Sequence, residues 1–305
     1  MFKSLPSKVR IVEVGPRDGL QNEKEILPLE DKLEYIKLLS KTGLDTIEVT
    51  SFVSPKAIPQ MGDANELFKA VDQSLNKDIN KPCLVPNLKG LEAAMESGVS
   101  EISLFSATSD SFTKKNINCT VEESFNRMGE VAKIAQDNKI KMRGYVSTAF
   151  GCPYEGEVSV DKLLEVVKRF FNLGVYEVSV GDTIGVATPK QVDSILKRLS
   201  SEFDKNKLAM HFHDTRGMAV TNVLVSLENG YSVFDASSGG LGGCPYAKGA
   251  SGNVGTEDLI YLFDSLGIEH GVDMKALVDA SKFILEKLNK STTSKYLKAL
   301  LSNEK

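Results

Sequence analysis

The chain has 305 residues, 41% hydrophobic and 26% charged, with a formal net charge of −4. This is the composition of a globular protein large enough for one α/β barrel or two average domains. The weak negative charge gives no reason to expect nucleic acid or an anionic membrane as partner. Four cysteines without a pairing pattern indicate free thiols in a reducing compartment, and the first residues lack the apolar stretch of a signal peptide. We therefore expect a cytoplasmic protein.

Short runs of β-branched residues alternate with longer amphipathic segments along the chain. The pattern predicts eight strand–helix pairs, in the order 9–14 with 30–43, 44–50 with 64–75, 81–86 with 88–98, 99–106 with 120–138, 139–148 with 160–174, 175–182 with 188–203, 207–214 with 218–230, and 231–238 with 256–267. Several helical segments end in glycine before an apolar residue, as at Gly43 and Gly98. A left-handed glycine there ends the helix and leads into the next strand.

Eight such units predict an α/β fold, a (β/α)8 TIM barrel that forms a single domain over residues 1–305. Residues 271–305 add helical segments, which we expect to form a C-terminal extension on one flank of the barrel or against a neighbouring subunit. A doubly wound open sheet is the alternative, but no GxGxxG follows the first strand. Because catalytic groups of such barrels lie where strands end, these positions are the candidate site.

Two histidines stand at the end of the seventh predicted strand, in HFHD. His211 and His213 are two residues apart, so in a strand their side chains point to the same side. Paired imidazoles of this kind are typical of a divalent-metal site. Two polar residues bonded to their neighbours at a barrel mouth are the alternative. The chain has only three histidines, and two of them at one strand end favour the metal site.

The first predicted strand ends in EVGPRDGLQNE, where glycine and proline fix a turn that carries Arg17 and Asp18. Strands one, seven and eight become neighbours when a barrel closes, so Asp18 can reach the point that the histidines share. Asn253, after the eighth strand, can add a carbonyl oxygen. Turn formation or helix capping is the alternative for both residues. Nitrogen and oxygen ligands without thiolate favour Mg²⁺ or Mn²⁺, with Zn²⁺ or Co²⁺ as alternatives.

Two further acidic residues stand near strand ends. Glu48, if it points into the barrel, can hold Arg17 and orient its guanidinium toward a substrate carbonyl, but alternation alone does not decide its direction. Asp182, at the end of the sixth strand, is expected to orient a histidine. An N-cap of the following helix is the alternative for Asp182.

The segment GGLGGCPYAKGASGNVG, residues 239–255, contains seven glycines and one cysteine, Cys244. A thiol with a pKa of about 8.5 is mostly protonated at neutral pH, so it can act as an acid on a mobile loop. A structural thiol and a covalent nucleophile are the alternatives. Cys152 in FGCPYEG is a weaker candidate, because the fifth strand lies across the barrel from the predicted metal site.

Five stretches together resemble hydroxymethylglutaryl-CoA lyase. They are VRIVEVGPRDGLQNE, TIEVTSFVSPKAIPQMGD, SVGDTIGVATP, HFHDTRGMA and GGLGGCPYAKGASGNVGTEDL, in the order of that family from residue 9 to about 260. The resemblance implies cleavage of 3-hydroxy-3-methylglutaryl-CoA to acetyl-CoA and acetoacetate. It also implies a divalent metal, an acyl-CoA substrate and a homodimer.

The resemblance also implies roles for individual residues. It gives as metal ligands Asp18, His211, His213 and Asn253; as catalytic residues Arg17, Asp18, Glu48, His211 and Cys244; and as substrate-binding residues Arg17, Ser51 and Asp182. His211 and Asp18 are alternative bases for the substrate hydroxyl. A Claisen-type acyltransferase or a 4-hydroxy-2-oxoacid aldolase would keep the RD turn and HxH but would not need the glycine-rich cysteine segment. A non-catalytic barrel that binds metal or acyl-CoA would be expected to lose Arg17 or Cys244, and both are present.

Overall fold

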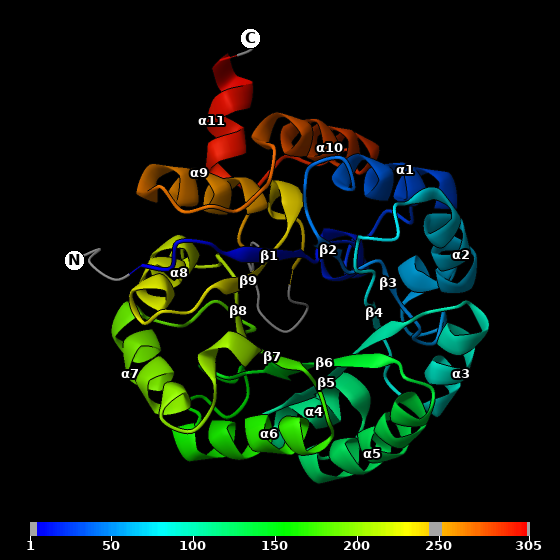
Figure 1. Cartoon of the computed structure of the whole chain (residues 1–305), viewed down its shortest axis with the longest axis vertical. Coiled ribbons are helices and arrows are strands. Elements are labelled where there is room, and N and C mark those ends of the chain that lie inside the picture. The colour runs from blue at the N-terminus through cyan, green and yellow to red at the C-terminus, as the bar shows by residue number, and fades with distance from the viewer. Residues whose placement is uncertain (1–4, 244–251, 304–305) are drawn as a thin grey trace.

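The computed structural model describes residues 5–243 and 252–303 (Figure 1). Within this part of the chain the strands are β1 (Arg10–Glu13), β2 (Thr46–Ile47), β3 (Thr50–Ser51), β4 (Cys83–Leu84), β5 (Glu101–Ala107), β6 (Lys141–Ser147), β7 (Glu177–Asp182), β8 (Leu208–Phe212) and β9 (Val233–Ala236). They form one sheet in the order β2-β1-β9-β8-β7-β6-β5-β4-β3, and each pairing is parallel. The predicted α/β class with a parallel sheet is confirmed.

One continuous segment supplies both ends of this sheet. β2 pairs with β1, whereas β3, which follows it in the chain, pairs with β4. Between them the backbone bonds to both sides: the amide of Ile47 donates to the carbonyl of Asn80, and the amide of Glu48 donates to the carbonyl of Glu13. The strands therefore surround a common axis, as Figure 1 shows.

The helices lie outside the strands, most of them in a ring (Figure 1). They are α1 (Leu29–Leu39), α2 (Ala64–Ser74), α3 (Leu88–Glu96), α4 (Asp110–Ile117), α5 (Val121–Asp137), α6 (Val160–Asn172), α7 (Pro189–Ser200), α8 (Ala219–Glu228), α9 (Thr256–Leu266), α10 (Met274–Lys287) and α11 (Lys295–Asn303). Helix α11 extends outward beyond α9 and α10 (Figure 1). α4 was not predicted, because it is short and polar and lacks an amphipathic repeat. Its start is stabilised by the Ser109 hydroxyl, which accepts the amide of Phe112 at 3.1 Å.

Helix α6 shows how the sequence positions this outer layer. Leu163, Val167 and Phe170 recur at helical spacing and are fully buried. The ring of Phe170 lies over Gly144 of β6, where an added Cβ would come within 2.7 Å of it. Phe170 also meets Phe125 of α5 edge to face, with ring centres 5.0 Å apart. Burial of a phenylalanine contributes about 1.5–3 kcal/mol, so these contacts fix α6 against the sheet.

The C-terminal helices pack against other helices and against the segment that follows β9. α10 packs against α1 and α9, and α11 packs against α9. The linker between α10 and α11 is hydrogen-bonded to the segment that follows β9. The Thr292 hydroxyl donates to the carbonyl of Gly239 at 2.8 Å, and the Thr293 hydroxyl donates to the carbonyl of Gly240 at 2.7 Å. The C-terminal extension therefore holds the start of the glycine-rich segment.

None of the helices described here has the length and apolar character that a bilayer crossing demands.

A buried carboxyl group joins β1 to the chain after β9. Glu13 is 0% exposed and accepts hydrogen bonds from the amides of Gly15 and Ser238, both at 2.9 Å, and from the hydroxyl of Thr256 at 2.7 Å. Burial raises the pKa of Glu13 to about 8, although the three donors oppose the shift. Glu13 is therefore protonated in the native protein across much of the neutral range.

We expect Glu13→Gln to flatten the dependence of stability on pH. Because the native pKa of about 8 lies above the ordinary value of 4.5, the native state keeps a proton that the unfolded chain loses. Stability is then fully present below the unfolded pKa and falls as pH rises toward the native pKa. Urea unfolding at a series of pH values should show this decline in the wild type and a weaker one in the variant.

The matched control is Glu34→Gln, which changes an exposed glutamate of α1. Its pH profile should run parallel to that of the wild type. A Glu13→Gln profile that also runs parallel would contradict the assigned protonation state.

Candidate metal and active site

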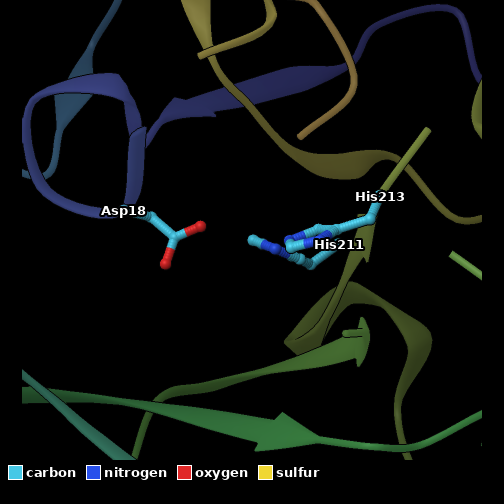
Figure 2. Close-up of side chains that lie close together, drawn as sticks. All are labelled: Asp18, His211 and His213. Atoms are coloured by element: carbon cyan, nitrogen blue, oxygen red, sulfur yellow. The ribbon is translucent and has the colours of Figure 1, made fainter. Parts of the chain in front are cut away.

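Asp18, His211 and His213 lie together where β1 and β8 end (Figure 2). One potential ligand atom from each side chain lies within 4.8 Å of the others. Asp18 comes from the turn after β1, His211 is in β8, and His213 follows that strand directly. Figure 2 shows the carboxylate facing the two imidazoles. The structure thus brings Asp18 together with two histidines that lie almost two hundred positions further along the chain.

The turn that carries Asp18 is one tight helical turn, Gly15–Gly19. The amides of Arg17, Asp18 and Gly19 all donate to the carbonyl of Val14, at 3.2, 2.8 and 3.1 Å. Gly15 has no room for a side chain, because a Cβ there would lie 2.4 Å from the hydroxyl of Tyr35. The sequence GPRDG therefore lets the turn pack closely and aims Asp18 across the end of the sheet.

The pKa shifts of Asp18 and His213 favour the forms that bind a divalent cation. Burial and the nearby His211 lower the pKa of His213 to about 4, although Asp18 opposes the shift. The Nδ1 atom of His213 is buried and has no hydrogen-bond partner among the described residues. Burial opposes ionisation of Asp18, but Arg17 and the imidazoles hold its pKa below the usual range. One carboxylate and two imidazoles are a donor set that fits such an ion.

Asn253 lies beside the cluster, but as a hydrogen-bond donor. Its Nδ2 donates to Asp18 Oδ2 at 2.9 Å and to the carbonyl of Leu241 at 3.2 Å. A backbone bridge places Asn253 opposite His213. Presentation of the amide oxygen to an ion would require the amide to turn over. The role of Asn253 as a fourth ligand stays a prediction.

Glu48 points into the space that the strands enclose, a direction that the alternation of residues in the sequence did not decide. Its Oε2 accepts from Arg17 Nε at 2.7 Å and from the Tyr145 hydroxyl at 3.1 Å. Arg17 also donates to Asp18 Oδ1 at 2.6 Å, and its guanidinium lies 5.1 Å from the centre of the Tyr145 ring. Burial works against the charge of Arg17, but Glu48 and Asp18 raise its pKa above the ordinary value. The guanidinium of Arg17 is therefore a fixed positive charge next to the cluster.

A cavity of about 520 Å³ opens over these groups. Its lining includes Arg17, Asp18, Tyr145, His211 and His213, and also Gly243, the last described residue before the gap. Its volume is in the range of small-molecule sites.

The two predicted substrate-binding residues Ser51 and Asp182 do not line this cavity. Ser51 is 0% exposed, and its hydroxyl donates to the carbonyl of Leu84 at 3.4 Å. Both oxygens of Asp182 accept backbone amides, from Val186 and Ala187 at 2.9 Å each. Asp182 thus shapes the turn before α7, instead of orienting a histidine as expected. It is not the helix cap either, because Thr188 occupies that position.

Of the two candidate cysteines, the described residues include only Cys152. Cys244 lies outside the described residues. Cys152 is buried, and its Sγ donates to the Ser109 hydroxyl at 3.0 Å. It borders a different cavity, with Phe150 and Val186. Cys152 thus borders a cavity other than the one beside the Asp18–His211–His213 cluster, and it stays the weaker candidate for an acid.

Three inward side chains at the site were missed by the sequence reasoning: Arg143, Tyr145 and Asp235. Asp235 Oδ2 lies 3.2 Å from His211 Nδ1 and is the carboxylate that contacts this histidine. Burial opposes ionisation of Asp235, but Arg143 and His211 hold its pKa well below the usual range. The available signal was a charged residue in the middle of an apolar strand, in KMRGYVS and VFDA, since such residues are rarely buried without a partner.

The fold and the cluster define an α/β protein with a candidate divalent-metal site at the ends of its strands. Over residues 8–284 the chain matches the model of the HMGL-like family, and it belongs to that family. It is 52% identical to the mitochondrial hydroxymethylglutaryl-CoA lyase of Homo sapiens, over 97% of this chain and 90% of that protein. It is 51% identical to the cytoplasmic 3-hydroxy-3-methylglutaryl-CoA lyase of Danio rerio, over 98% and 89%.

Two solved structures are also similar. The hydroxymethylglutaryl-CoA lyase from Pseudomonas aeruginosa superimposes with a TM-score of 0.94 at 48% identity, covering 98% of this chain and 99% of that one. An HMG-CoA lyase from Acinetobacter baumannii, in complex with coenzyme A and 3-methylmalate, has a TM-score of 0.92 at 40% identity, covering 96% and 95%.

We expect His213→Ala to weaken Mn²⁺ binding by more than the roughly 10–100-fold typical of changes outside the first coordination shell. The physical reason is the loss of an imidazole whose nitrogen has no other partner. The signal of free Mn²⁺ in electron paramagnetic resonance, followed during titration, gives the dissociation constant.

His270→Gln is the matched control, because the third histidine lies outside the cluster and bonds Asp264 at 2.9 Å. Its Mn²⁺ affinity should equal that of the wild type. Wild-type affinity in His213→Ala would exclude His213 as a ligand.

Proposed function

We propose that this chain is a hydroxymethylglutaryl-CoA lyase, which cleaves 3-hydroxy-3-methylglutaryl-CoA to acetyl-CoA and acetoacetate. The observation that carries the proposal is one cavity bordered by both the Asp18–His211–His213 cluster and the ion-paired Arg17, in a chain about half identical to named lyases. The relative in complex with coenzyme A supports an acyl-CoA as the substrate.

The metal in this proposal is Mg²⁺ or Mn²⁺, held by Asp18, His211, His213 and Asn253. The mixed nitrogen and oxygen donors support this choice. Such an ion, when bound, polarises the substrate oxygens and lowers the pKa of the tertiary hydroxyl.

The other steps belong to side chains of this chain. The base that takes the hydroxyl proton is His211 or Asp18, and both border the cavity. Arg17 stabilises the negative charge that develops on the thioester oxygen as the carbon–carbon bond breaks. Glu48 and Asp18 hold its guanidinium, so the cation needs little reorganisation during the reaction. Loss of such a contact typically costs about 10²–10³-fold in rate.

Cys244 donates the proton that the departing acetyl-CoA carbanion needs. Both described ends of its segment support this role: Gly243 lines the cavity, and Asn253 contacts Asp18. Ser51 and Asp182 then act on the substrate through the backbone that they shape, since both are buried and hydrogen-bonded.

We further propose that residues 1–305 form a single (β/α)8 barrel domain, with 271–305 as a C-terminal helical extension. The closure of the sheet by residues 46–52 and the packing of α10 on α1 support it. We also propose a homodimer, on the resemblance to the family. A cytoplasmic location is proposed from the three described cysteines, which are all free, whereas the relatives carry both mitochondrial and cytoplasmic names.

A coupled assay with the thioester and Mg²⁺ tests the function. We expect the wild type to form acetoacetate and acetyl-CoA in equal amounts without release of free CoA thiol, which an acyltransferase reaction would produce. His211→Ala and Cys244→Ala should each lower kcat by about 10²–10⁴-fold, the range for loss of an acid or base.

Cys152→Ala is the control, because this buried thiol borders the other cavity, and it should turn over like the wild type. Absence of acetoacetate from the wild type would refute the function. Full turnover by Cys244→Ala would remove only the acid role of that cysteine.

A further inference from the structure

A chain of buried ion pairs runs through the barrel interior toward the metal cluster. Arg10, at the start of β1, pairs with Glu177 of β7. Glu177 Oε1 accepts from Arg143 Nε at 2.8 Å, and Arg143 Nη2 donates to Asp235 Oδ1 at 2.7 Å. The side chains of Arg143 and Asp235 are fully buried. The charges alternate in sign along the chain, and its last member contacts His211.

Asp235 uses its two oxygens differently. Oδ1 accepts from Arg143 Nη2 at 2.7 Å, whereas Oδ2 accepts from the Ser179 hydroxyl at 2.6 Å, lies 3.2 Å from His211 Nδ1 and accepts only a longer bond of 3.4 Å from Arg143 Nη1. The pairing of β8 with β9 fixes this approach, because His211 and Asp235 are direct partners in the parallel register. The contact is therefore built into the sheet and does not depend on a loop.

Arg143 is a permanent cation, and it keeps the adjacent carboxylate ionised. An ionised carboxylate accepts hydrogen bonds and cannot donate them. The nitrogen of a neutral His211 that faces Asp235 must therefore carry the ring proton. The other nitrogen, Nε2, then carries no proton, and its lone pair is free to bind an ion.

We propose that Asp235, held by Arg143, is a positioning residue that fixes the proton of His211 on Nδ1 and so presents Nε2 to the divalent cation. The proposal rests on the proposed function only in taking His211 as a ligand, and it makes Asp18 the base for the substrate hydroxyl, because both ring nitrogens of His211 are then occupied. His213 has no equivalent support, since its Nδ1 has no hydrogen-bond partner among the described residues. The two histidines thus differ: one is oriented by the barrel interior and the other by burial alone.

The first test needs no mutation. The chain has three histidines, so nitrogen NMR of the protein labelled with ¹⁵N-histidine can resolve each ring. In the metal-free wild type, in mildly alkaline solution, His211 should show its proton on Nδ1. A proton on Nε2 would overturn the proposal.

The second test is Asp235→Asn. Arg143 needs an acceptor, so the oxygen of the new amide will turn toward Arg143 and its NH₂ group toward His211. The NH₂ group can only donate, which moves the ring proton of His211 to Nε2 and blocks the ligand atom. We expect Mn²⁺ to bind roughly 10–100-fold more weakly, the usual effect of losing such a partner.

Two further variants separate positioning from stability. In Arg143→Met combined with Asp235→Asn, the amide is free to turn its oxygen to His211, so the Nδ1 proton and most of the Mn²⁺ affinity should return. Glu177→Gln breaks a buried ion pair of the same Arg143 without touching His211. It should lower the melting temperature and leave Mn²⁺ affinity within experimental error.

The outcomes are distinct. Mn²⁺ affinity that falls in Glu177→Gln as much as in Asp235→Asn, or that does not return in the double variant, would reduce Asp235 to a structural residue and overturn the proposal. A wild type that cleaves the thioester while Asp235→Asn keeps both affinity and tautomer would overturn it as well, with the lyase function intact. A wild type without lyase activity, whose His211 proton still follows Asp235 and Arg143, would refute the function and support the positioning role.

Discussion

The parallel pairing of β9 with both β1 and β8 is the constraint on which the site depends. β9 lies between these strands, so the turn after β1 and the end of β8 reach over the same point. β9 itself supplies Asp235, and the chain that follows it returns Asn253 to a bridge with His213. A shift of β9 by one residue would turn Asp235 to the other face of the sheet and away from His211. The geometry of the cluster therefore depends on the pairing of β1, β9 and β8 together.

The space enclosed by the strands is stabilised by charges as well as by apolar side chains. Tyr145 separates two cations, with Arg17 and Arg143 at 5.1 and 4.9 Å from its ring centre, and Glu48 accepts its hydroxyl. Removal of one partner from such a buried pair typically costs about 3–5 kcal/mol, because the other charge is left without compensation. Folding and site geometry are thus coupled: the groups that hold Arg17 and His211 in place also satisfy the charges of the core.

The features that could be predicted from the sequence are those that depend on the local pattern of residues. The order of strands and helices, the common side of His211 and His213 and the meeting of the RD turn with them follow from periodicity and from the closure of the sheet. The partner of His211 did not follow, because the choice between Asp182 and Asp235 depends on which residues face each other across β8 and β9. Glu48 could not be oriented either, since its strand is interrupted between β2 and β3 and bonds to both neighbours there.

The mobility expected from the number of glycines in residues 239–255 is not the only reason for glycine there. At two of these positions the structure leaves no room for a side chain. At Gly240 a Cβ would lie 2.2 Å from the Thr293 hydroxyl, which is the group that holds the Gly240 carbonyl. At Gly252, where φ is +89°, a Cβ would lie 2.6 Å from the backbone of Gly242. The two stems of the segment therefore need glycine in order to pack against each other and against the C-terminal linker. Because the same stems carry Asn253 to Asp18, the geometry of the Asp18–His211–His213 cluster depends on close packing at the base of the segment.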